Sequence, residues 1–139
     1  MHVFIDTSVF IYSFAFPESN SKLVLSLAEN KEFHVIISEL VLLEVKKFVR
    51  QKFTDKEAYH AIEYLKDLAE IVPRESLSDL MKKLKGSIAD KDLEHLAAAE
   101  YRRVDYIVAY DKHFDVSPKY RTPKGFLKEL GINTYATEY

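Results

Sequence analysis

The segment HVFIDTS, residues 2–8, decides the fold of this chain. Its apolar run from Val3 to Ile5 is typical of a short buried strand, and a charged residue, Asp6, ends the run at once. Similar short runs recur along the chain, at Val35 to Ile37, Glu70 to Val72 and Tyr106 to Ala109, with a fifth expected near Asn133 to Ala136. We therefore expect a sheet built from segments that are far apart in the sequence.

Longer stretches with helical periodicity separate these runs. Thr54, with Glu57 three residues later, predicts a capping box, and Ser38 is a candidate N-cap. Thr122-Pro123 is expected to begin the last helix, and Gly131 to end it. Because strands alternate with helices, the sequence predicts an α/β fold of three α/β/α layers around a central, mainly parallel sheet of four to five strands.

The composition favours one compact domain over residues 1–139, since the chain shows no repeat, no linker and no shift between its halves. Cysteine is absent, which excludes disulfides, zinc-thiolate sites and thiol nucleophiles. No leader segment or transmembrane-length run is expected, so the interpretation is a soluble cytoplasmic protein with no membrane partner. The net charge of −2 does not by itself indicate a nucleic-acid binder, although a bound divalent ion would cancel two charges.

Four acids stand where apolar elements would normally avoid charge. Asp6 and Asp111 each close a predicted strand, and the carboxyl ends of parallel strands meet at one edge of a sheet. Glu44 lies on the apolar stripe of a predicted helix, and Asp92 opens an alanine-rich one. If the four converge, they form an oxygen-lined site for Mg²⁺ or Mn²⁺, which would activate water for hydrolysis of a phosphodiester.

Each acid also has a purely structural interpretation. Asp6 and Asp111 suit turns after strands, Asp92 suits the first turn of a helix, and Glu44 suits a buried hydrogen bond. The combination of all four at the expected strand and helix positions favours a common site.

The segments that carry these acids have a definite order and spacing: FIDTSV (4–9), SELVLLEV (38–45), DLEHLAAA (92–99) and IVAYDKHF (107–114). Together they resemble the PIN-domain nucleases, in particular the small prokaryotic toxins of VapBC toxin–antitoxin systems, over nearly the whole chain. The resemblance implies a metal-dependent endoribonuclease that cleaves RNA, with an antitoxin protein as partner and a homodimer as its assembly. Asp6, Asp92 and Asp111 would bind the metal, and Glu44 would be a further ligand or orient the water.

Other residues near the four motifs are candidates with open alternatives. Ser8 is either a hydroxyl that serves a ligand or the substrate, or a helix cap. Asp90 either adds to Asp92 or caps the helix that it is expected to precede. The histidines show no metal-site spacing among themselves, and His95 either reaches the site from three residues beyond Asp92 or packs within its helix. Ala109 departs from the family pattern, which often has a hydroxyl residue there.

Two other classes of acidic site lack their required residues. An aspartyl-phosphate phosphatase needs a second Asp two residues after the first, where this chain has Ser8, and a receiver module needs an adjacent acidic pair and a late lysine. The remaining alternative is a catalytically weakened PIN-like domain that binds RNA or protein. Ala109 and the mild net charge favour it.

Overall fold

The computed structural model describes residues 1–139 and is centred on a five-stranded sheet. The strands are β1 (His2–Ile5), β2 (His34–Ser38), β3 (Ala69–Val72), β4 (Tyr106–Val108) and β5 (Tyr120–Arg121). Their order is β3-β2-β1-β4-β5, and every neighbouring pair is parallel. The predicted α/β class is confirmed, with β1 in the middle of the sheet.

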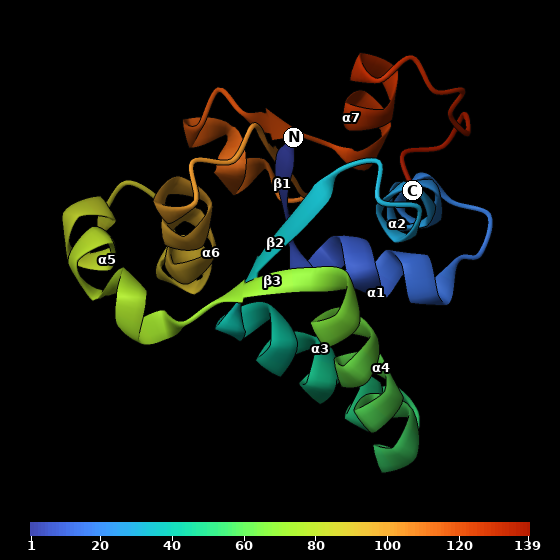
Figure 1. Cartoon of the computed structure of the whole chain (residues 1–139), viewed down its shortest axis with the longest axis horizontal. Coiled ribbons are helices and arrows are strands. Elements are labelled where there is room, and N and C mark those ends of the chain that lie inside the picture. Colours follow the sequence, from blue (N-terminus) through green and yellow to red (C-terminus); the bar gives the residue numbers. More distant parts are fainter.

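Helices cover both faces of this sheet (Figure 1). They are α1 (Thr7–Ala15), α2 (Asn20–Glu29), α3 (Glu39–Lys52), α4 (Asp55–Leu68), α5 (Ser78–Leu84), α6 (Asp90–Tyr101) and α7 (Pro123–Glu129), with short 3-10 helices η1 (Arg74–Leu77) and η2 (Lys112–Val116). Helices α5 and α6 lie on one side, and α1, α2 and α7 on the other (Figure 1). Helices α3 and α4 form an αα-hairpin, which projects beyond the sheet (Figure 1).

The core explains why the strands have unbroken apolar runs. Val3, Phe4 and Ile5 of β1 are fully buried, and Ile36 and Ile37 of β2 are buried in the same way. A parallel strand covered by helices on both faces has no solvent side, so alternation with polar residues is absent. Because all five strands are parallel, each one ends at the same edge of the sheet.

The predicted helix caps are confirmed. Ser38 accepts a hydrogen bond from the Val41 N–H group, and Thr54 forms the capping box with Glu57. Thr122 caps α7 ahead of its first residue, Pro123. After α7, Gly131 has φ of 73°, a left-handed conformation in which glycine is unstrained.

The expected fifth strand near Asn133 to Ala136 is wrong, because the fifth strand is β5. The 133–136 segment has no strand pairing and is held by the side chain of Asn20 instead. Asn20 Oδ1 accepts from the Tyr135 N–H group at 2.9 Å, and its Nδ2 donates to the Thr137 carbonyl at 2.7 Å. Fully buried Asn20 thus joins the start of α2 to the last residues of the chain.

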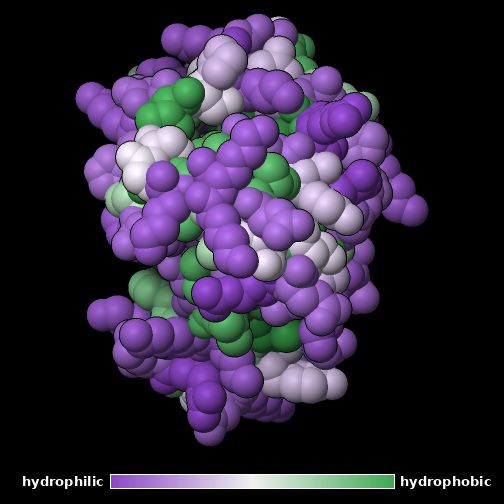
Figure 2. All heavy atoms as spheres, turned by 90° about the vertical axis from the view of Figure 1, so that its left-hand side faces the viewer, coloured by the Kyte–Doolittle hydropathy of each residue, from purple (hydrophilic) through white to green (hydrophobic).

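The outer surface is mainly polar on the side that carries α5, where apolar areas are small and interrupted (Figure 2). None of the helices combines the length and apolar character that a membrane span requires.

Candidate metal centre

Adjacent strands bring Asp6 and Asp111 to the same end of the sheet. Asp6 follows β1 directly, and Asp111 comes three residues after β4 ends. The two strands are paired up to this edge, where the Asp6 N–H group donates to the Val108 carbonyl at 3.0 Å. The carboxyl edge of the sheet therefore carries both acids, as expected from the strand pattern.

Asp6 is buried at the start of α1 and is its N-cap residue. Its Oδ2 accepts from the hydroxyl of Ser8 at 2.7 Å and more weakly from the Ser8 N–H group. Burial raises the pKa of the Asp6 carboxyl, and nearby His95 and the bonds from Ser8 only partly oppose that rise. Asp6 is thus a carboxylate with too little positive charge around it.

Glu44 approaches from the second turn of α3. Its Oε1 accepts from the hydroxyl of Thr7 at 2.7 Å and from Nε2 of His95 at 2.8 Å. The side chain is 39% exposed, so it lies at the border between the core and solvent. Burial on its own would raise the pKa of Glu44, but the bonds from His95 and Thr7 outweigh it and hold the pKa below its ordinary value.

His95 connects Glu44 with Asp6. Its ring is buried, with Nδ1 bonded to the hydroxyl of Ser38 at 2.8 Å and Nε2 lying 3.7 Å from Asp6 Oδ1. Burial would lower the pKa of His95, yet the bond to Glu44 and the charges of Asp6, Glu44 and Asp92 raise it. These neighbouring carboxylates therefore favour the protonated form of the imidazole.

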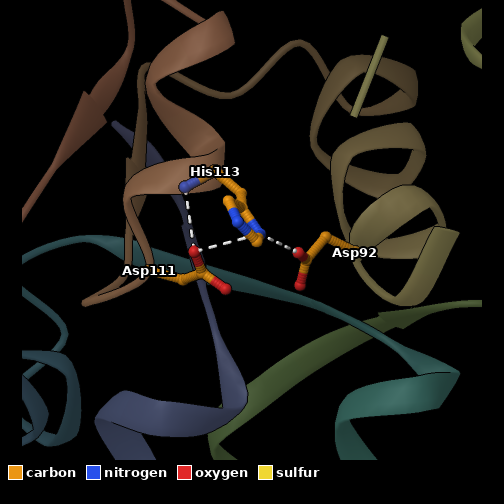
Figure 3. Close-up of side chains that lie close together, drawn as sticks. All are labelled: Asp92, Asp111 and His113. Carbon is orange, nitrogen blue, oxygen red and sulfur yellow. Dashed lines mark hydrogen bonds and ion pairs between the residues drawn. The ribbon is translucent and has the colours of Figure 1, made fainter. Parts of the chain in front are cut away.

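Asp92 and Asp111 form the other part of the cluster, together with His113 (Figure 3). Asp92 is buried in the first turn of α6, and its Oδ2 lies 3.1 Å from Nδ1 of His113. Asp111 caps η2 and accepts from the His113 N–H group at 2.9 Å, while its Oδ1 lies 3.3 Å from the same Nδ1. Donor atoms of the three residues all lie within 4.8 Å of one another.

Lys91 provides an exposed cation beside these acids. Its ammonium donates to Asp111 Oδ2 at 2.9 Å and lies 3.5 Å from Asp92 Oδ2, while the side chain is 64% exposed. Burial would raise the pKa of Asp111, but the bonds from the His113 N–H group and from Lys91 lower it. The charge of Lys91 also lowers the pKa of Glu44, and the charge of Asp92 raises the pKa of His95. The group of Asp6, Glu44 and His95 and the group of Asp92, Asp111 and His113 are therefore close enough to interact electrostatically.

The remaining sequence candidates occupy different places. Ser8 bonds Asp6, and the cap of α1 is Asp6 itself, so the capping alternative for Ser8 is wrong. Asp90 does not precede α6 but is its first residue, exposed to solvent, and Ala89 is the N-cap. Asp90 is therefore outside the group of Asp92, Asp111 and His113. Ala109 is fully buried beyond β4.

The sequence pattern missed Lys91, His113 and Glu94. Glu94 is a buried acid, but it serves the helix rather than the cluster: its Oε2 accepts from the Leu40 N–H group at 3.0 Å at the start of α3. Lys91 and His113 carry no signal beyond their nearness to Asp92 and Asp111 in the chain. Their roles depend on how α6 and η2 face each other (Figure 3).

The donor set fits a divalent cation. Asp6 and Asp92 are buried carboxylates, which are costly to keep ionised without a cation close by. Neighbouring ligands of an octahedral ion bound at about 2.1 Å lie about 3 Å apart. The 3.1 Å and 3.3 Å separations of His113 Nδ1 from the oxygens of Asp92 and Asp111 match that spacing.

Known proteins share this architecture. A toxin–antitoxin complex from Klebsiella pneumoniae aligns with a TM-score of 0.68 at 17% identity, covering 87% of this chain and 97% of that one. VapBC2 of Rickettsia felis, solved with a DNA fragment from its promoter, gives 0.61 at 18%, covering 88% and 98%. VapC20 of Mycobacterium tuberculosis, described as a sarcin-ricin-loop-cleaving toxin, gives 0.62 at 14%, covering 84% and 95%. At these identities the likeness shows a shared fold.

Sequence comparison identifies the family of the chain, whereas the structural comparison shows only its fold. No curated protein sequence matches the chain. Residues 2–113, however, match the family described as PIN domain, and this span begins in β1 and contains Asp6, Glu44, Asp92 and Asp111. With the family match covering most of the chain, and the fold agreeing with it, this protein belongs to the PIN-domain family.

Proposed function

We propose that the chain is a metal-dependent endoribonuclease that hydrolyses RNA phosphodiester bonds. Two groups of acids at one end of the sheet support this proposal: donor atoms of Asp92, Asp111 and His113 lie within 4.8 Å of one another, and Asp6 and Glu44 both lie close to His95. Carboxylates kept this close repel one another and require a cation, and oxygen ligands suit Mg²⁺ or Mn²⁺. A bound ion of this kind would supply an activated water and neutralise charge on the phosphate.

The burial and contacts of each acid indicate its role at the proposed metal site. Asp6, Asp92 and Asp111 would hold the metal, with the Ser8 hydroxyl fixing the direction of the Asp6 carboxylate. Glu44 is the most exposed of the four and has a lowered pKa, so it is ionised and open to water at neutral pH. We assign it as a further ligand or as the base that orients the attacking water.

We infer that RNA is the substrate and that an antitoxin controls the activity. The fold is that of VapC20, described as a toxin that cleaves the sarcin-ricin loop, and of VapBC complexes in which toxin and antitoxin are bound together. An apolar cleft lined by Phe14, Val49, Phe53 and Tyr64 opens between α1, α3 and α4 and gives a partner protein a surface. A homodimer acting in the cytoplasm completes the proposal.

A second candidate function is a weakened PIN domain that binds RNA or protein without cleavage. Ala109 favours it. This residue is fully buried and has a methyl group where the PIN-domain pattern often has a hydroxyl residue. A neighbouring hydroxyl contact is that of Ser8, which accepts from the N–H group of Tyr110, the residue after Ala109, at 3.5 Å. A cleavage assay separates the two functions.

Removal of divalent metal is expected to abolish RNA cleavage. The purified protein should cut single-stranded or structured RNA with Mg²⁺ or Mn²⁺, lose this activity in EDTA, and regain it when excess metal returns. Denaturing gel electrophoresis of end-labelled RNA measures the cleavage, and a DNA strand of equal sequence is the control. RNA binding without any cleavage would favour the weakened domain, and full cleavage in EDTA would contradict a metal-dependent nuclease.

Lys91→Met is expected to tighten divalent metal binding by about two- to fivefold, the effect of an exposed ion pair worth up to about 1 kcal/mol. The ammonium bonds Asp111 and must leave it when a divalent ion binds. Calorimetric titration with Mn²⁺ measures the change. Lys82→Met, at an exposed position of α5, is the matched control and should bind metal as the original chain does. Weaker binding by Lys91→Met would show that this ammonium does not compete with metal.

A further inference from the structure

His113 lies in a position that the sequence pattern did not mark as part of the site. It belongs to η2, two residues after Asp111, and its ring faces Asp92 of α6 across the gap between the two elements (Figure 3). Nδ1 is 3.1 Å from Asp92 Oδ2 and 3.3 Å from Asp111 Oδ1. One ring nitrogen is thus directed at the two carboxylates that the proposed function assigns to the metal.

The local fold fixes this placement. Asp111 accepts the His113 N–H group, which sets the start of η2, and the next side chain, Phe114, is fully buried. With Phe114 held in the core, His113 projects from the other side of the turn toward Asp92. Its side chain remains 54% exposed, so the ring can adjust by the few tenths of an ångström that coordination needs.

A hydrogen bond alone accounts poorly for the arrangement. Nδ1 carries at most one proton, so it can donate to Asp92 or to Asp111 but not fully to both. A cation between the three groups would be bound by all of them at once. The separations agree with neighbouring ligands of an octahedral ion, which lie about 3 Å apart.

We propose that His113 is a direct ligand of the metal through Nδ1 and that this nitrogen gives the site a preference for Mn²⁺ over Mg²⁺. The inference rests on the proposed function for the existence of the metal and adds the identity of one ligand and of the ion. Carboxylate and water ligands suit both ions, whereas imidazole nitrogen favours first-row transition metals over Mg²⁺. A set of Asp92, Asp111 and His113 is therefore tuned away from magnesium.

The rival role for His113 is that of a protonated counter-charge, and it has the opposite consequence. An imidazolium bonded to Asp92 would compete with every divalent cation, as Lys91 does. Removing it would strengthen the binding of Mg²⁺ and Mn²⁺ alike. A ligand, when removed, weakens Mn²⁺ binding and leaves Mg²⁺ binding much less affected. The sign of the change therefore separates the two roles.

The experiment compares the full chain with His113→Gln in the absence of RNA, at neutral pH, where an imidazole can act either as a ligand or as a cation. Calorimetric titration gives the affinity for Mn²⁺ and, separately, for Mg²⁺. We expect His113→Gln to lose about tenfold or more in Mn²⁺ affinity and less than about threefold in Mg²⁺ affinity. Pulsed electron paramagnetic resonance should detect a coordinated nitrogen on bound Mn²⁺ in the original chain and none in the variant.

The controls keep the outcome decisive. Lys112→Gln changes the exposed neighbour in the same turn, and its Mn²⁺ to Mg²⁺ preference should equal that of the original chain. Thermal unfolding checks that His113→Gln folds, which its exposure favours. Tighter binding of both ions, an unchanged preference, or no nitrogen signal in the original chain would overturn the inference while leaving the proposed nuclease intact. Failure of the original chain to bind any Mn²⁺ would overturn both.

Discussion

Asp6→Asn is expected to reduce metal-dependent RNA cleavage by at least about a hundredfold, the scale of losing one charge-stabilising group at a reaction centre. The variant keeps the size and the hydrogen-bond acceptor of the side chain, so the bond from Ser8 can persist. It removes the negative charge that draws the metal. The loss should appear in the turnover of saturating RNA, since Asp6 is assigned to the metal rather than to the RNA.

The same change should leave the fold as stable or make it more stable at neutral pH. The pKa of Asp6 is raised by burial from its ordinary 3.8, so the ionised form is less favourable in the folded chain than in the unfolded one. Its cost to stability therefore grows as the pH rises from about 3.8 to the folded pKa and stays constant above it. Neutral asparagine has no such cost. Asp6 would therefore lower the stability of the fold while it supports the activity.

Urea denaturation and RNA cleavage, measured on the same samples, test both halves of this prediction. Asp67→Asn, at an exposed position of α4, is the matched control and should change neither quantity. Cleavage that survives Asp6→Asn would falsify the assignment of Asp6 to the metal. An unfolded variant would show instead that Asp6 is needed as the charged cap of α1.

Phe114→Ala is expected to lower the free energy of unfolding by about 3–5 kcal/mol, the usual cost of removing a buried phenylalanine ring. Phe114 is fully buried, and its ring centroid lies 6.4 Å from that of His95. The change leaves a cavity between η2 and α6, under the turn that carries Asp111 and His113. Activity should fall as well, because the two halves of the cluster would no longer be held at a fixed distance.

Urea denaturation measures the change for Phe114→Ala. Val116→Ala removes an apolar group from the end of the same short helix, but this side chain is 52% exposed and its loss should cost less than about 0.5 kcal/mol. A loss below about 1.5 kcal/mol for Phe114→Ala would mean that the turn is anchored by other residues. Phe114→Leu fills most of the cavity, so its loss of unfolding free energy should lie between those of Phe114→Ala and Val116→Ala.

The strands and helix ends followed from local patterns, and the reason is physical. A strand covered by helices on both faces needs a continuous apolar run. Val3 to Ile5 is such a run, so it is predicted as a buried strand. Caps such as Ser38 and Thr54 depend on bonds within one turn. By contrast, β5 is only two residues long and too short for any periodicity, while Tyr135 is positioned by Asn20 from the other end of the chain.

The acids of the candidate site could be predicted from two local signals, the ends of strands and the apolar stripes of helices. Asp6 and Asp111 follow from topology, since parallel strands bring their carboxyl ends together. His95 and His113 depend instead on how α6 packs against α3 and η2, and the spacing of histidines in the chain contains no trace of this. Lys91 could not be predicted either, because it lies in α6 and its partner Asp111 precedes η2, and their contact depends on how these elements pack.

The placement of each acid on a different element has a consequence for biosynthesis. Asp6 is made early, but its neighbour Asp111 belongs to a strand that joins the sheet beside β1 only after most of the chain exists. A growing polypeptide on the ribosome therefore lacks a complete set of the candidate metal-binding acids until that strand has emerged and docked. Under the proposed function, the order of translation would delay RNA cleavage until the chain is nearly complete.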